Sequence, residues 1–549
     1  MDKRVFAAAC VLWGAPVGLA QCDLLLREGV RDFGQSVALF GQRALVGGPA
    51  VWGVAGLHGS AHVYDLGGEG WVLTADLGAS DSHQGDEFGY AVALDGTWAL
   101  VGAPVGDGPV IDCGTAYLLE DQSGTWVEGE RFAPPELMAG ARFGDAVALQ
   151  GDTLLIGAPN FGLDAAQPSA VFVYARQGLN WTQVDRWSGS SSMPGDFFGG
   201  SVALDGLWAA VGVQRDDAGG TDAGAVYIFQ FGGGIWQERA KLVASDAASD
   251  ARFGWDVALS GSTLMVGARF SDNGGLSRGE VYFFEESGGV WSESSHFSGQ
   301  TLQQFDNLGT SVALQGGYAA AGAAYGDGVL DGTGTLTYFQ RGPGGWAESG
   351  WRMDPEGTQG NRFGHALALD RSGATTTLLV GAVGQSATAV GTGAVQVLDI
   401  AGADGDGDGV QDSCQCAALP YCPASPNSSG PGAAMGHIGS LSVADNGLYL
   451  IANGASQGSI GLFLYGDNEI SAPLGDGTLC IGAPQYRLGL APTDATGGAI
   501  LPVDLSAPPS AAGQVQPYST WRFQFWFRDL AAGGAGHNLS NGLAITFCP

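Results

Sequence analysis

Lysine is nearly missing from this chain of 549 residues, which has only Lys3 and Lys241. All basic side chains together number 22, against 55 acidic ones, for a formal net charge of -33. A surface of this sign repels the phosphates of nucleic acids and of anionic lipids, which argues against nucleic acid as a partner. It suits solubility, a divalent cation or a basic partner.

Familiar catalytic motifs are missing as well. The sequence has no Gly-x-Ser-x-Gly elbow, no His-Glu-x-x-His pair and no glycine loop of the phosphate-binding kind. His58 and His62 have the spacing of metal ligands only in a helix, and they lie in a strand-like run. The other histidines are isolated, and the acidic residues are too many for a glycosidase pair to be picked out. These absences favour a protein that is not an enzyme.

Long apolar runs are confined to the N-terminus. Lys3 and Arg4 precede an apolar stretch over residues 5–17. Gly18, Leu19 and Ala20 follow, and the expected cleavage site lies after Ala20. This pattern predicts a secretory signal peptide over residues 1–20 and an exported protein, secreted or held at the cell surface. A lipoprotein anchored through Cys22 is the alternative, although Gln21 stands where a small residue is expected. No later stretch is long enough to predict a membrane span.

A short phrase returns every 55 residues and organises most of the chain. It opens with Phe-Gly at residues 33, 88, 143, 198, 253 and 363, and with Leu308-Gly309 in the sixth copy. Within a copy, two apolar runs flank a turn such as Asp95-Gly96, a third run follows, and a fourth begins at a tryptophan such as Trp126. Four short strands per repeat predict a β-propeller blade.

Seven copies predict a seven-bladed propeller over residues 21–400. The last copy lacks its tryptophan strand, and the run at residues 23–26 is expected to supply it and close the ring. An open solenoid is the competing arrangement, but neither end has the polar cap that it needs. We expect the ring to be monomeric.

The paired phrases Phe-Gly and Gly-Ala-Pro resemble the FG-GAP repeats of integrin α-subunits and of many secreted bacterial proteins. The resemblance covers residues 22 to 400 and is closest over residues 88–104 and 143–159. It implies a propeller used in binding or cell adhesion. The calcium loop that integrin-type blades often insert between the first two strands is replaced here by the tight turn, so in-blade calcium is not expected.

One face of the ring is expected to hold the longer loops, those joining strands 2 to 3 and 4 to 1. Loops on a rigid scaffold often carry binding sites. The acidic residues there are candidate ligand contacts, although any single one is better explained by solvation of the rim. They are Asp107, Asp112, Asp216, Asp217, Asp222, Asp272, Asp327 and Asp331.

The most specific chemical motif is an alternating Asp-Gly segment inside a predicted linker over residues 401–431. Asp404, Asp406, Asp408 and Asp412 fall at positions 1, 3, 5 and 9 of a calcium loop, and Val410 offers its carbonyl at position 7. Position 12 is Gln415 rather than glutamate, so the segment resembles thrombospondin type 3 or dockerin repeats. It predicts bound Ca²⁺, with a flexible acidic linker as the alternative.

A compact domain resembling a β-sandwich is predicted over residues 432–549. In its clearest strand, residues 521–528, aromatic side chains alternate with polar ones, which is typical of a half-buried strand. Export permits disulfides, and we predict a pair between Cys480 and Cys548, each in an apolar strand-like run. An odd cysteine remains once the signal peptide is removed.

Two functions therefore remain open. The first is a secreted or surface protein, not an enzyme, whose propeller loops bind a protein or glycan partner and whose linker binds calcium. The second is an extracellular hydrolase or lyase acting on polysaccharide, which requires carboxylates or histidines that converge at the axis of the ring.

Overall fold

The structure, a computed structural model, falls into two compact units, residues 1–410 and 411–549. It describes residues 24–26, 32–49, 58–67, 70–159, 169–178, 180–271, 277–299, 306–326, 332–353, 360–372, 375–384, 393–400, 418–422, 424–438, 441, 443, 446, 448–506, 513–515, 519–531 and 534–547. The described elements are all strands, and none of the described residues forms a helix long and apolar enough to cross a membrane.

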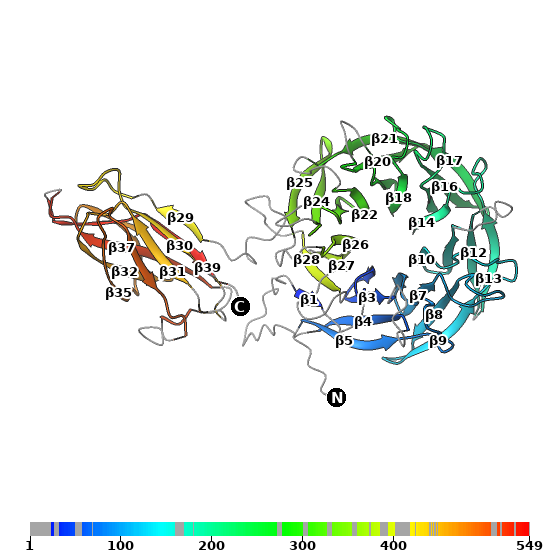
Figure 1. The fold of residues 1–549 in the computed structure, drawn as a ribbon, viewed down its shortest axis with the longest axis horizontal. Coiled ribbons are helices and arrows are strands. Elements are labelled where there is room, and N and C mark those ends of the chain that lie inside the picture. The colour runs from blue at the N-terminus through cyan, green and yellow to red at the C-terminus, as the bar shows by residue number, and fades with distance from the viewer. Residues whose placement is uncertain are drawn as a thin grey trace. The chain divides into compact units, whose positions relative to one another are not determined.

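The described part of the first unit forms seven four-stranded antiparallel sheets, which Figure 1 shows around a ring. The first strands, nearest the centre, are β2 (Ser36–Phe40), β6 (Ala91–Asp95), β10 (Val147–Gln150), β14 (Phe198–Asp205), β18 (Phe253–Ser260), β22 (Leu308–Gln315) and β26 (Phe363–Ser372). The second strands are β3 (Arg43–Gly48), β7 (Trp98–Ala103), β11 (Thr153–Ala158), β15 (Trp208–Val213), β19 (Thr263–Ala268), β23 (Tyr318–Ala323) and β27 (Thr375–Ala382).

The third and fourth strands complete each sheet toward the outside. The third strands are β4 (Ser60–Gly67), β8 (Thr115–Asp121), β12 (Ala170–Gln177), β16 (Ala225–Gly232), β20 (Glu280–Ser287), β24 (Thr335–Gly342) and β28 (Ala394–Asp399). The fourth strands are β5 (Gly70–Leu77), β9 (Trp126–Phe132), β13 (Asn180–Trp187), β17 (Ile235–Leu242), β21 (Val290–Phe297), β25 (Gly345–Met353) and, in the last sheet, β1 (Leu24–Leu26). We number the sheets as blades 1 to 7, from β2–β5 to β26–β28 with β1.

The N-terminal strand pairs as the sequence predicts. Leu25 of β1 lies opposite Gln396 of β28, so the start of the chain completes the blade formed by its end. Leu26 is also part of one apolar core with Phe33 of blade 1 and Val395 of blade 7. Both edges of the array are therefore covered, as a closed ring requires.

Phe-Gly occupies the middle of a tight turn that leads into each first strand. In blade 1 the amide of Gln35 donates to the carbonyl of Asp32 over 3.0 Å, and Gly34 has a φ of 84°. This is the arrangement of a type II turn, which needs glycine at its third position. The preceding Phe33 is completely buried, as are its counterparts in the other blades. The Phe-Gly pair thus combines a tight turn with a buried side chain that packs in the core.

Close backbone contact explains the second glycine of the repeat. A Cβ on Gly381 of blade 7 would lie 2.2 Å from the carbonyl oxygen of Gly34 in blade 1. The same relation joins neighbouring blades elsewhere, with 2.0 Å between a Cβ on Gly102 and the carbonyl oxygen of Gly144. Blades therefore stack backbone against backbone at these positions.

The second unit contains two main sheets and a hairpin. One sheet has the order β29 (Ala418–Cys422), β39 (Gly542–Thr546), β37 (Thr520–Arg528), β32 (Ile460–Gly466) and β35 (Tyr486–Pro492), with β38 (His537–Leu539) also paired to β37. The second sheet is β30 (Ala434–Ile438), β31 (Tyr449–Asn453) and β36 (Ala499–Pro502), and the hairpin is β33 (Glu469–Leu474) with β34 (Gly477–Ile481).

Both main sheets of this unit contribute to one apolar core. Leu450 of β31 and Phe463 of β32 share it with the aromatic stripe of β37, where Phe523, Phe525 and Phe527 are completely buried. The stripe is packing rather than an exposed sugar platform. One predicted boundary is wrong: β29 lies inside the segment predicted as linker up to residue 431, yet it pairs with β39 and is part of the second unit.

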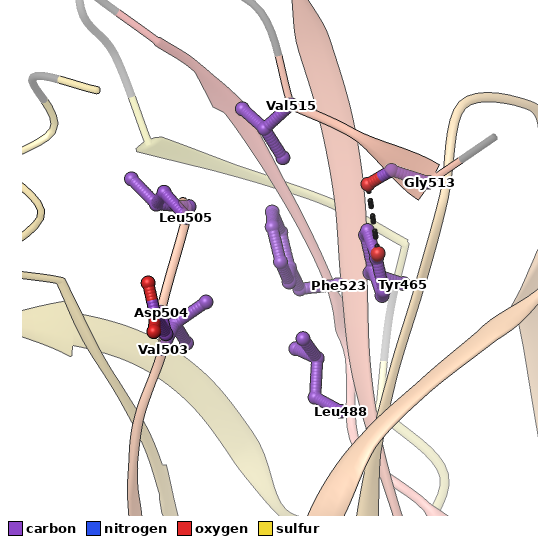
Figure 2. Close-up of a pocket in the computed structure, with 8 residues that line it drawn as sticks. All are labelled: Tyr465, Leu488, Val503, Asp504, Leu505, Gly513, Val515 and Phe523. Carbon is purple, nitrogen blue, oxygen red and sulfur yellow. Dashed lines mark hydrogen bonds between the residues drawn. The ribbon is translucent and has the colours of Figure 1, made fainter. Parts of the chain in front are cut away.

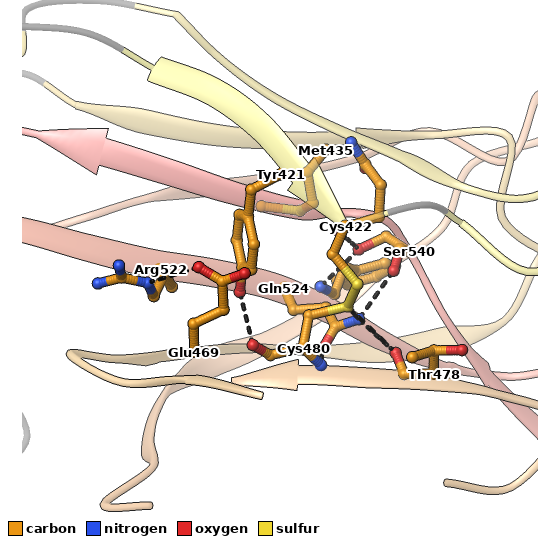
Figure 3. The surroundings of a disulfide bond; sticks show 11 residues. Tyr421, Cys422, Met435, Glu469, Thr478, Cys480, Arg522, Gln524 and Ser540 are labelled. Atoms are coloured by element: carbon orange, nitrogen blue, oxygen red, sulfur yellow. Dashed lines mark hydrogen bonds and ion pairs between the residues drawn. A yellow bond between two sulfur atoms is a disulfide. The ribbon is translucent and has the colours of Figure 1, made fainter. Parts of the chain in front are cut away.

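The predicted disulfide is also wrong. Cys480 bonds to Cys422, whose Cα lies 6.2 Å away, while Cys548 is outside the described residues. Figure 3 shows the surroundings, where the buried Gln524 accepts from the amide of Cys480 over 2.9 Å and donates to the carbonyl of Thr478 over 2.8 Å. Strand-like sequence around a cysteine does not reveal which strand lies beside it, and here β29 brings Cys422 to the hairpin. Among the described cysteines Cys113 is free and buried.

Candidate functional site

The residues that flank each Phe-Gly phrase form a ring of their own at one face of the propeller, which we call the rim. Directly before the aromatic residue come Asp32, Glu87, Arg142, Phe197, Arg252, Asn307 and Arg362. Directly after the glycine come Gln35, Tyr90, Asp145, Gly200, Trp255, Thr310 and His365. The rim also includes residues that directly follow the second strands in blades 4 to 6, namely Gln214, Arg215, Arg269, Phe270 and Tyr325.

Local backbone geometry aims these side chains away from the sheets. All seven residues before the aromatic position have positive φ, for example 59° at Arg252 and 54° at Arg362. In blades 4 to 7 the ladder also skips two residues: in blade 7 Phe363 pairs with Ala382 and Ala366 with Gly381, which leaves His365 out. A bulge of this kind redirects the extra side chain, here at the innermost strand.

Blades 4 to 7 contribute a cluster of arginines braced by aromatic rings. The guanidinium carbon of Arg269 lies 4.0 Å from the ring centre of Trp255 and 4.4 Å from that of Phe270. Tyr325 lies between Arg269 and Arg362, whose guanidinium carbons are 5.5 Å and 5.3 Å from its ring centre. A fourth arginine, Arg215, stacks on Phe197 at 4.4 Å.

These positive groups influence one another across blades that are not adjacent. Burial lowers the pKa of Arg269 in blade 5 although its hydrogen bond with Tyr325 raises it, and the neighbouring Arg252 and Arg362 lower it further. Burial likewise lowers the pKa of His365 to about 4, with Arg362 and Arg269 adding to the effect. Blade 6 lies between blades 5 and 7, and its Tyr325 contacts arginines of both, which links the charges of the three blades.

Counter-charges are scarce in this cluster. Of Arg215, Arg252, Arg269 and Arg362, only Arg252 forms an ion pair within the described residues, with Asp222 at 3.2 Å. Several buried polar atoms of the cluster have no hydrogen-bond partner among the described residues. They are Gln214 Oε1, Arg215 Nε, Arg252 Nε, Arg269 Nε, Asn307 Oδ1 and His365 Nδ1.

Blades 1 to 3 give the rim an acidic half. Arg142 lies 2.7 Å from Asp145 and 3.8 Å from Glu87, and its guanidinium carbon is 5.1 Å from the ring centre of Tyr90. Burial raises the pKa of Glu87, and Asp145 and Asp32 act in the same direction against Arg142. Burial also raises the pKa of Asp145 itself. The rim therefore has opposite charge on its two sides.

Five of the acidic loop residues predicted from the sequence lie in the described part, and each has a partner nearby. The amide of Asp112 donates to Asp107, and that of Asp222 donates to Asp217 over 2.8 Å. Asp216 is buried and pairs with Lys241 at 2.7 Å. Their contacts stabilise loops, and Asp222 alone reaches the rim through Arg252. Asp272, Asp327 and Asp331 lie outside the described residues.

The predicted calcium ligands Asp404, Asp406, Asp408, Val410 and Asp412 also lie outside the described residues. Within the described part, no group of three or more histidine, cysteine or acidic side chains is arranged to hold a metal ion.

A small pocket in the second unit is a weaker candidate. Figure 2 shows Tyr465, Leu488 and Phe523 among its lining, with the Tyr465 hydroxyl donating to the carbonyl of Gly513 over 2.8 Å. Its free space is about 10 Å³, the size of a single water site. The pocket therefore belongs to the packing of the core.

Sequence reasoning missed the rim, because it treated the repeated phrase as purely structural. The signal was present in the positions beside the phrase. These positions vary between Asp32, Arg142 and Phe197 before the aromatic residue while the phrase itself hardly changes. Variable, charged and aromatic positions next to a constant backbone motif are where a repeat scaffold can carry recognition.

Comparisons with known proteins support the repeat assignment. The FG-GAP repeat family matches residues 71–119, 126–174, 181–229 and 236–284, each span running from a fourth strand to the third strand of the next blade. No curated protein matches the sequence. A chain in the crystal structure of a mitotic checkpoint complex is similar at 15% identity, over 73% of this chain and 99% of that chain, with a TM-score of 0.43. A likeness of that degree supports no functional argument.

Proposed function

We propose that this FG-GAP repeat protein, whose first unit is an all-β propeller, is a secreted or cell-surface binding protein, not an enzyme, and that its rim holds the ligand, a glycan or a protein. One observation carries the proposal: six buried polar atoms of blades 4 to 7 lack hydrogen-bond partners in the described structure. Each such atom costs about 1–3 kcal/mol, and a ligand at the rim that supplies the partners would remove this cost.

Export and calcium belong to the same proposal. The N-terminal pattern of residues 1–20 supports secretion, and the spacing from Asp404 to Asp412 supports calcium binding before the second unit. The second unit then serves attachment, sorting or adhesion.

A second candidate is the polysaccharide hydrolase or lyase. The observation that favours it is the convergence of Glu87, Asp145 and Tyr90 with raised pKa values on one side of the rim. A buried carboxyl with a raised pKa can act as a general acid. The second candidate therefore predicts turnover at these residues.

A glycan array probed with the full-length protein, with calcium and with chelator, separates the two. Binding without shortening or unsaturation of any bound polymer supports the binding protein. Turnover of any polymer that Asp145→Asn abolishes would establish the enzyme instead. If neither glycans nor extracellular protein partners bind, the rim is not a ligand site and the proposal fails.

A further inference from the structure

We propose that the arginine cluster of blades 4 to 7 binds the acid groups of an anionic polysaccharide, either carboxylates or sulfate esters. The inference rests on the proposed function of the rim and adds the chemistry of its ligand. It places the contact at Arg215, Arg269 and Arg362, the arginines without an ion-pair partner in the described structure.

Unbalanced positive charge is the first argument. The protein carries a net charge of -33, yet it gathers four arginines of blades 4 to 7 within interaction range of His365 or of one another. Burial lowers the pKa of Arg269 and of His365, and repulsion from the neighbouring arginines lowers both further. An anion at the centre of the cluster removes this repulsion, and the low local dielectric strengthens its attraction.

The orientation of Arg269 is the second argument. Trp255 and Phe270 lie against the guanidinium, with ring centres 4.0 Å and 4.4 Å from its carbon atom, and hold the group in place. Tyr325 is a hydrogen-bond partner of the guanidinium, while Nε has no partner among the described residues. A guanidinium presented edge-on binds a carboxylate or sulfate through two parallel hydrogen bonds.

Neutral acceptors beside the arginines distinguish a sugar from an acidic peptide. Gln214 Oε1 and Asn307 Oδ1 are buried acceptors without a donor in the described structure. A sugar acid carries hydroxyl donors on the carbons next to its acid-bearing carbon, within reach of both kinds of group. An acidic peptide separates its carboxylates from its backbone N–H groups by a flexible side chain. Buried acceptors on the same rim as the cations therefore favour the polysaccharide.

Calorimetric titration of the full-length protein tests the ligand class. The probes are polygalacturonate, alginate and chondroitin sulfate, with methyl-esterified polygalacturonate as the neutral match and poly-glutamate as the peptide. We expect at least one acidic polysaccharide to bind, with affinity that falls as salt is raised. The esterified polymer and the peptide should bind about tenfold more weakly or not at all.

Variants locate the contact. Arg269→Gln and Arg362→Gln should each lower the affinity for the acidic polysaccharide by about tenfold or more, as expected for the loss of a charge-assisted hydrogen bond. Arg239→Gln is the matched control, because Arg239 is exposed on the fourth strand β17 and its Nε donates to Gln230. Arg362 is exposed too, so its replacement leaves the packing intact even if the Arg269 variant proves unstable.

The outcomes separate the two levels of the proposal. Equal binding of the esterified polymer, preference for poly-glutamate, or loss of affinity in the Arg239 variant alone overturns the anion site and leaves the rim as a binding surface of another kind. The same holds if every acidic polysaccharide fails while the glycan array finds a neutral ligand. If neither the calorimetric titration nor the binding test of the proposed function detects any ligand, the proposed function itself is wrong.

Discussion

Adding one methyl group at the seam between blades 7 and 1 tests whether the ring is closed. Gly381 lies next to the end of β27, and a Cβ there would meet the carbonyl oxygen of Gly34 at 2.2 Å. Normal contact between such atoms needs 3.4 Å or more. The backbones of the two blades must therefore separate by roughly 1 Å, and a forced separation of this kind costs about 1–3 kcal/mol.

Two matched substitutions make the result specific. Gly102→Ala introduces the same clash at an internal seam, where a Cβ would lie 2.0 Å from the carbonyl oxygen of Gly144. Gly78→Ala places its methyl group in open space, with no atom within 4 Å. Because alanine also restricts the unfolded chain, we expect Gly78→Ala to be neutral or to stabilise by about 0.4–1 kcal/mol.

Urea unfolding followed by tryptophan fluorescence gives the comparison, because each complete repeat carries tryptophan. A closed ring predicts that Gly381→Ala and Gly102→Ala lower the unfolding midpoint by similar amounts, and that Gly78→Ala does not. If Gly381→Ala behaves like Gly78→Ala while Gly102→Ala remains costly, the seam between blades 7 and 1 is not packed and the ring is open.

Three further predictions concern stability. Burial lowers the pKa of His365 to about 4, below its ordinary value of 6.5, so the stability gained from the neutral imidazole is complete above pH 6.5 and is lost as pH falls from 6.5 to 4. The melting temperature of His365→Gln should therefore depend less on pH over that window than that of the native protein, and an equal pH dependence of the two proteins would refute the assignment. Cys480→Ser should destabilise the second unit by about 2–4 kcal/mol, because the Cys422–Cys480 bond closes a loop of 58 residues; a reducing agent should then affect the native protein and not the variant. Calcium should raise the melting temperature of the native protein more than that of Asp408→Asn, and equal shifts would show that the metal does not bind there.

Much of the propeller could be predicted from the sequence, because its local signals and its global order agree. The turn glycines, the apolar runs and the tryptophans recur every 55 residues, and each has one structural role within a blade. The closing strand followed from the same logic, since the last copy lacked one strand and the N-terminus offered it.

The site was harder, because it depends on which side chains of different blades meet. Arg269 and Arg362 are 93 positions apart in the chain, and the local sequence around each does not predict that both lie against Tyr325. The disulfide failed for the same reason: Cys480 and Cys548 look alike in sequence, but the position of β29 beside β39 decides that Cys422 is the partner. Distant contacts of this kind are set by tertiary packing and not by local pattern.

Hydrogen exchange with and without bound acidic polysaccharide tests the central claim most directly. The account predicts slower exchange in peptides that contain residues 252–256, 307–310 and 362–365, the entrances to the first strands of blades 5, 6 and 7, with little change in the fourth strands. Protection confined to the fourth strands or to the second unit, with these rim peptides unchanged, would contradict it.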